Sequence, residues 1–137
     1  MLKKDDLQVG QLLAPASFIV NRKILKSYAD ASGDQNPIHQ DEEFAKSVGL
    51  PNVIAHGMLT MAFGGRYLSE LADGPGSIKE FSSRFTKPVV VAEGEDVEII
   101  FTGKISEIDG NQIKVDIEAR SSGEKVLGMA KALLEIN

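Results

Sequence analysis

The chain has no cysteine, no long apolar run and no excess of basic residues. Without cysteine there is neither a disulfide framework nor a thiolate metal site, which agrees with a reducing compartment, and we expect a cytoplasmic protein. No apolar run follows the lysines near Met1, and none approaches the length of a membrane span, so neither a secretory signal nor a membrane partner is expected.

The balance of charge excludes one further class of partner. The chain carries 15 Lys and Arg against 20 Asp and Glu, which gives a net charge of −5 at neutral pH. That sign opposes general attraction to nucleic acid, so no nucleic-acid partner is expected. A length of 137 residues suits one domain with a core of its own, and no internal repeat is visible, so we expect residues 1–137 to form a single domain.

One short segment, from Tyr28 to His39, carries two groups suited to proton transfer. Asp34 supplies a carboxylate that accepts protons near neutral pH, and His39 supplies an imidazole that can donate or accept them. The residues around them favour a rigid loop, because Gly33 tolerates a positive φ, Asn36 can bond local backbone and Pro37 fixes its own φ. The segment therefore predicts a preorganised pair of candidate catalytic residues.

Three helices are predicted in the first half of the chain. Asn21 is a suitable N-cap for a helix that Gly33 ends, and Asp41 suits the start of a second, short helix before Gly49. The third helix is predicted from Gly57 to about residue 72, and its first turns are apolar on nearly every side, which indicates a helix buried all round.

The second half of the chain has the alternation typical of strands. Apolar residues alternate with polar ones over 97–101 and 113–119, and Asp109-Gly110-Asn111 between these runs favours a tight hairpin. A last strand is expected over about 125–136, and a further strand over 81–91 requires Pro88 to lie at an edge or a bulge. Helices followed by an antiparallel meander predict an α+β fold in which a curved sheet wraps a long central helix.

The loop also carries a family signature. Tyr28 with Ser32-Gly33-Asp34-x-Asn36-Pro37-x-His39 and Ala45 resembles the signature of the hydratase 2, or MaoC-like, family of R-specific enoyl-thioester hydratases, although Ala31 stands where the family usually has a larger aliphatic residue or glycine. Residues 84–89 and Gly94 resemble the family's strand after the central helix, so the resemblance covers nearly the whole chain. It implies a single hot-dog fold, and a homodimer or a heterodimer with a second hot-dog subunit.

The resemblance also implies an activity, namely reversible hydration and dehydration of trans-2-enoyl and (3R)-3-hydroxyacyl thioesters of CoA or acyl carrier protein in fatty acid metabolism. Asp34 and His39 would activate one water and move its proton, without a cofactor. Gly57 would polarise the thioester carbonyl, because a helix N-terminus presents unpaired N–H groups to a developing oxyanion, and a glycine leaves room for an acyl chain. Gly33, Asn36, Pro37 and His56 would support the loop. Because the pair lies outside the predicted core, Asp34→Asn and His39→Ala are each expected to abolish most turnover while leaving folding intact.

Several alternatives accompany this hypothesis. Asp34 and His39 can be ordinary loop residues, and the calcium-loop pattern fails because Gln35 stands where the sharp-turn glycine belongs. Asp34, His39 and His56 offer zinc donors, but no His-x-x-x-His or cysteine pair supports them, so no metal is expected. Two other functions are considered for the chain: a hot-dog acyl thioesterase, and a non-catalytic acyl-binding subunit of a heterodimeric dehydratase. Within the family, the chain over 33–50 and 54–61 with Gly64-Gly65 most resembles the catalytic β subunit of actinobacterial (3R)-hydroxyacyl-carrier-protein dehydratases. Such a subunit would run the reaction toward dehydration.

Overall fold

A computed structural model describes all 137 residues and contains one five-stranded antiparallel sheet with a long helix on one of its faces. The strands follow the order β1-β3-β4-β5-β2, so the first two strands of the chain form the two edges of the sheet. The elements are β1 (Leu12–Val20), α1 (Arg22–Ser32), a 3₁₀ turn (Pro37–His39), α2 (Glu42–Ser47), α3 (Gly57–Leu71), β2 (Ile78–Phe85), β3 (Val97–Asp109), β4 (Gln112–Ser121) and β5 (Glu124–Glu135). This is the predicted α+β, hot-dog architecture.

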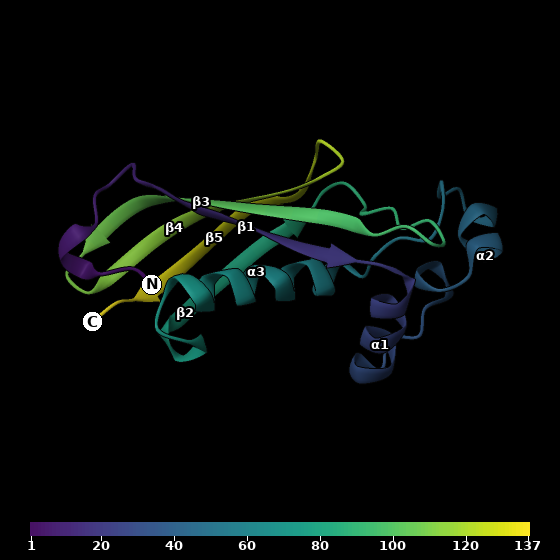
Figure 1. Ribbon diagram of the computed structural model, residues 1–137, viewed down its shortest axis with the longest axis horizontal. Helices are drawn as coiled ribbons and strands as arrows, with labels where there is room; N and C mark the ends of the chain where they lie inside the picture. The colour runs from purple at the N-terminus through teal and green to yellow at the C-terminus, as the bar shows by residue number, and fades with distance from the viewer.

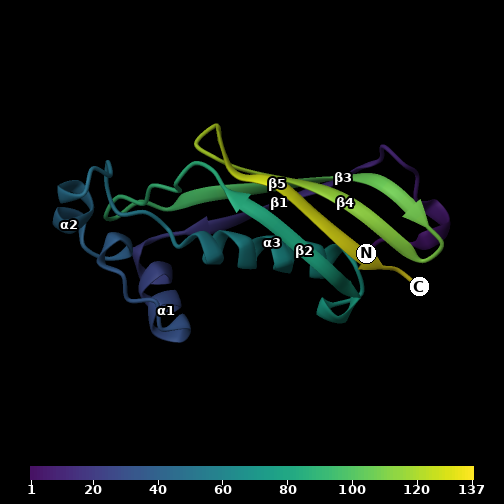
Figure 2. The same ribbon diagram turned by 180° about the vertical axis from the view of Figure 1, so that it is seen from behind.

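The sheet curves around α3. In the views from the front and from behind, β1 and β2 pass on opposite sides of the helix while β3, β4 and β5 lie across it (Figures 1 and 2). A core of 26 buried residues fills the space between them. The helix approaches the sheet closely at Gly64, where a Cβ atom would lie 2.8 Å from the ring of Phe81, so a larger residue there would push the two layers apart.

One prediction about α3 was wrong, because the helix is not buried all round. Met58, Ala62, Arg66 and Glu70, spaced four residues apart, form an exposed stripe on the side that faces away from the sheet. Leu59, Tyr67 and Leu68 lie on the opposite side and belong to the core. The first turns have apolar residues on every side, but a single sheet covers only one side of a helix.

A second correction concerns the expected strand over 81–91. The strand β2 runs from Ile78 to Phe85, and beyond Thr86 the chain leaves β5 and turns toward the segment before α3. There Ala55 N–H donates to the Val89 carbonyl and Val91 N–H donates to the Val53 carbonyl, each at 2.8 Å. Pro88 has no N–H and lies between Thr86, which still bonds the chain at Val126, and Val89, which pairs with the segment before α3, and this is why one strand does not continue through it.

The segment between β1 and α3 projects beyond one end of the sheet, and the chain termini lie at the other end (Figure 1). Its helices have the predicted caps: Asn21 accepts from Ile24 N–H, Asp41 accepts from Phe44 N–H, and Gly33 ends α1 with φ +83°. No helix combines the length and apolar character needed to cross a bilayer. The candidate catalytic loop lies within this projecting segment.

Candidate active site

The loop after α1 is held by side chains that bond their own backbone. Asp34 Oδ1 accepts from Asn36 N–H at 3.1 Å, and Asn36 Oδ1 in turn accepts from Ile38 N–H at 3.2 Å. Gly33 takes the left-handed conformation, and Pro37 begins the 3₁₀ turn that leads to His39. These local turns fix the path of the backbone, so the loop has the rigid geometry that its residue types predict.

His39 lies inside the protein rather than on the surface, with 7% of its area exposed. Its Nδ1 donates to the Ile54 carbonyl at 2.7 Å, since a carbonyl can only accept, and the lone pair of neutral His39 is therefore on Nε2. Burial lowers the pKa of His39 below its ordinary value, and His56 lowers it further, against opposing effects of the Ile54 hydrogen bond and of Asp34. The imidazole is accordingly a neutral base with one nitrogen free to act.

His56, the N-cap residue of α3, contacts both members of the candidate pair. Its ring stacks on His39 with centroids 3.8 Å apart and planes 23° apart, and its Nε2 donates to the Asp34 main-chain carbonyl at 3.1 Å. The Tyr28 ring packs against it in an edge-to-face arrangement, with ring centroids 4.8 Å apart. Its Nδ1 is buried and has no partner within the chain. His56 thus connects the Asp34 loop to the His39 ring through two different contacts.

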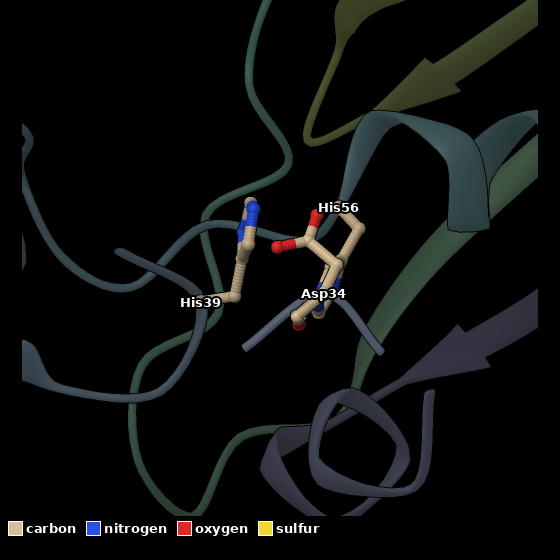
Figure 3. A group of neighbouring side chains, drawn as sticks. All are labelled: Asp34, His39 and His56. Atoms are coloured by element: carbon tan, nitrogen blue, oxygen red, sulfur yellow. Dashed lines mark hydrogen bonds between the residues drawn. The ribbon is translucent and has the colours of Figure 1, made fainter. Parts of the chain in front are cut away.

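The fold brings three side chains together: Asp34 from the loop after α1, His39 from the 3₁₀ turn that follows, and His56 from the start of α3. One potential ligand atom from each residue lies within 4.8 Å of the others, and the Asp34 carboxylate points toward the His39 ring (Figure 3). Asp34 is exposed, whereas both histidines are buried. An exposed carboxylate facing a buried neutral imidazole can share and transfer the proton of a water molecule placed between them.

The same three residues are the donors that a metal site would use. The two imidazole rings, however, lie nearly face to face, so lone pairs in their planes run side by side instead of converging on one ion. One nitrogen of each ring is also committed to a carbonyl oxygen. This arrangement suits proton transfer better than the tetrahedral coordination that zinc prefers.

Gly57 begins α3 and offers free N–H groups. The N–H groups of Gly57 and Met58 have no hydrogen-bond partner in the chain, and the positive end of the helix dipole adds to their attraction for an anion. The predicted reason for the glycine needs correction. A Cβ atom at position 57 would lie 2.7 Å from Cδ2 of Phe85, so the space next to Gly57 belongs to that ring and is not open to an acyl chain.

A cavity of about 350 Å³ lies beside these groups. His39 and Gly57 contribute to its wall, and most of the remaining wall is apolar, with Leu50, Ile54, Ala55, Thr60, Phe85, Thr86, Lys87, Pro88, Val89 and Val126 as the other lining residues. Its volume is within the range of small-molecule sites. A larger hollow of about 560 Å³ lies between the chain termini, but its lining includes no histidine, so it is not the site of this chemistry.

Two networks that sequence reasoning missed hold the loop in place. On the solvent side, Asp30 accepts from Lys26 and Gln35, and Gln40 donates to Gln35. Each bond joins residues four or five positions apart, a spacing that was visible in the sequence.

Beneath the loop, Arg22 donates to the Val91 carbonyl at 2.7 Å and to Asn52 at 2.9 Å, and Asn52 donates to Glu42. These residues are far apart in sequence, so no local pattern predicts this second network. It connects α1, α2 and the segments on either side of the site.

Comparison with known proteins gives one family. The family described as "MaoC like domain" matches residues 10–124 of the chain. The fatty acid synthase beta subunit TOXC of Cochliobolus carbonum is 37% identical over 77% of this chain and 5% of that protein. The (R)-specific enoyl-CoA hydratase of Rhodospirillum rubrum is 32% identical over 75% of this chain and 72% of that protein.

The solved structures agree with these sequence relatives. A structure of a MaoC-like dehydratase superimposes with a TM-score of 0.94 at 39% identity, covering 97% of this chain and 42% of that one. The first curated relatives that the chain matches are considerably longer, and it spans between 5% and 51% of their lengths.

Proposed function

The chain belongs to the MaoC-like family, and from this premise we propose that it is a hydro-lyase acting on acyl thioesters. The reaction is the reversible hydration of a trans-2-enoyl thioester to a (3R)-3-hydroxyacyl thioester in fatty acid metabolism. The observation that carries the proposal is the proximity of Asp34 to His39, where His39 lines an apolar cavity together with Gly57, whose N–H has no partner in the chain. The names of the relatives, which include an (R)-specific enoyl-CoA hydratase, support it.

Hydration requires two proton transfers, and the pair supplies both. One member of the pair takes a proton from the water as the water oxygen adds to C3 of the substrate. The electrons of the double bond move toward the thioester carbonyl, and a proton from the pair then goes to C2. On His39 the nitrogen that takes part is Nε2, because Nδ1 is committed to the Ile54 carbonyl. Dehydration is the same sequence in reverse, and no cofactor is required.

Charge on the thioester oxygen is stabilised at the start of α3. The Gly57 N–H donates to the carbonyl oxygen as negative charge develops there, and the helix dipole acts in the same direction. Gly33, Asn36 and Pro37 support the pair by fixing the loop, and His56 supports it from below through the Asp34 carbonyl.

We further propose that a second hot-dog subunit, identical or related, completes the assembly of this single hot-dog domain. The outer edge of β2 has no pairing partner, and the buried hydroxyl of Ser83 on this strand has no hydrogen bond within the chain. The exposed stripe on α3 includes the apolar residues Met58 and Ala62. Sheet edges of this kind are normally paired or covered. The acyl group would be carried by CoA or by acyl carrier protein, and the absence of cysteine supports a cytoplasmic location.

The proposed activity is tested by following the ultraviolet absorbance of crotonyl-CoA and of a longer trans-2-enoyl-CoA with the purified protein. Loss of absorbance, an (R)-configured product and no reaction by Asp34→Asn are the expected results. Release of free CoA thiol, measured in parallel with a thiol-reactive dye, would instead indicate a thioesterase. No reaction with CoA or carrier-protein substrates, even with a partner subunit present, would favour a non-catalytic acyl-binding role.

A further inference from the structure

The Phe85 side chain lies directly on the first residue of α3. A Cβ atom built on Gly57 would be 2.7 Å from Cδ2, 2.8 Å from Cε2 and 2.9 Å from Cγ of the Phe85 ring. The three atoms belong to one edge of the ring, so the ring fills the volume that a side chain at position 57 would occupy. Only a glycine at position 57 permits this contact.

Phe85 is also part of the wall of the candidate active site. It lines the same 350 Å³ cavity as His39, Gly57 and Thr60. It is the last residue of β2, where the chain begins to leave β5, and 53% of its area is exposed. A large aromatic side chain that is half exposed contributes less to the core than a buried one, so Phe85 can be shortened without removing a core residue.

The position of the thioester follows from the proposed role of Gly57. With its oxygen at hydrogen-bond distance from the Gly57 N–H, the carbonyl carbon and its two neighbours lie beside the start of α3. One neighbour is C2, which must also be within reach of the Asp34 and His39 pair in order to receive a proton. A substituent on C2 therefore lies against the part of the cavity wall to which His39, Gly57 and Phe85 contribute.

We propose that Phe85 is a specificity-determining residue that admits acyl thioesters unbranched at C2 and excludes those with a C2 substituent. The inference rests on the proposed function, because it uses the placement of the thioester at Gly57. The ring sets the width of the site at the reacting carbon and takes no part in proton transfer.

The test compares Phe85→Ala with the wild type on crotonyl-CoA and on its 2-methyl derivative. The value of kcat/KM for the branched substrate, divided by that for the unbranched one, is expected to rise at least tenfold in the variant, since a methyl group in an apolar pocket discriminates by about 10–200-fold. Phe44→Ala is the matched control, because Phe44 is a half-exposed phenylalanine on α2 that does not line the cavity, and its ratio should equal that of the wild type. Circular dichroism establishes that both variants are folded.

A ratio in Phe85→Ala within twofold of the wild-type ratio would overturn the inference. Binding of butyryl-CoA and 2-methylbutyryl-CoA, measured by calorimetry, separates its failure from that of the proposed function, since neither compound can be hydrated. If the wild type hydrates nothing but binds the unbranched compound at least tenfold more tightly, and Phe85→Ala loses this preference, the role of Phe85 stands and the hydratase proposal falls. Equal binding of both compounds by the wild type, or binding of neither, would refute the role of Phe85.

Discussion

Replacement of Asp34 by asparagine should separate the proposed catalytic role of this residue from its contribution to folding. Asparagine has the same shape as aspartate, and its side-chain oxygen can still accept from Asn36 N–H, so the turn is kept while the charge is removed. Asp34 is exposed and forms no salt bridge. The free energy of unfolding should therefore change by no more than about 0.5 kcal/mol, as for other surface substitutions.

The effect on the reaction should be far larger. A positioned proton acceptor contributes about 10²–10⁴-fold to a rate, and each factor of ten corresponds to about 1.4 kcal/mol of activation free energy. We expect kcat to fall by about 10²–10⁴-fold, with urea denaturation of the variant superimposing on that of the wild type. The assay is the loss of enoyl absorbance under saturating substrate. A variant that retains more than a tenth of the wild-type kcat would refute the role assigned to Asp34.

Three further predictions follow from the geometry of the site. His39→Ala should lower the free energy of unfolding by about 1–3 kcal/mol in urea denaturation, because it leaves the partly buried Ile54 carbonyl without a donor; a variant as stable as the wild type would show that this hydrogen bond contributes nothing. The lowered pKa of His39 means that the folded protein keeps the imidazole neutral below the ordinary value of about 6.5. The contribution of neutral His39 to the free energy of unfolding is therefore complete above that pH and is lost as the pH falls through the folded-state pKa. For the same reason, the acid limb of the pH–rate profile that reports His39 should lie below about 6.5. Gly57→Ala should lower the thermal midpoint, because the new Cβ would lie 2.7–2.9 Å from three atoms of the Phe85 ring, including Cγ at its root, so that the ring or the backbone must move. Its kcat/KM should fall at least tenfold, because the new methyl group and the displaced Phe85 ring would lie in the wall where the thioester is proposed to bind, and an unchanged value would contradict the placement of the thioester at Gly57.

The parts of the fold that depend on local chemistry were predictable from the sequence. Asn21 and Asp41 cap the helices that they were expected to cap, Gly33 ends α1, and Gly110 lies in the turn between β3 and β4. Each of these features depends on the conformational preferences of a few consecutive residues. The approach of Asp34 to His39 was predictable for the same reason, since one short loop carries both.

The parts that depend on distant contacts were not predictable in this way. His39 was expected to lie outside the core, but it is buried under His56 and bonded to Ile54, so the expectation that His39→Ala leaves folding unaffected is withdrawn. Phe85 was not singled out at all, because nothing in its surroundings in the sequence relates the end of β2 to the start of α3. Contacts between elements far apart along the chain leave no periodic pattern.

The projecting segment that carries the candidate site is attached to the fold differently from the strands, so we expect its opening free energy to differ from that of the sheet. Few hydrogen bonds join this segment to the chain that follows β2, namely the pairing of Val53 and Ala55 with Val89 and Val91 and the side-chain bonds of Asn21 to Asp96 and of Arg22 to Val91. In native-state hydrogen exchange, we expect such a unit to open at a lower free energy than the four long antiparallel pairings of the sheet. A ligand that bridges His39 and Gly57 binds only the closed form, and at a hundredfold excess over its Kd it raises that opening free energy by about 2.7 kcal/mol. Amide exchange in residues 34–56 therefore reports ligand occupancy even for compounds that do not react.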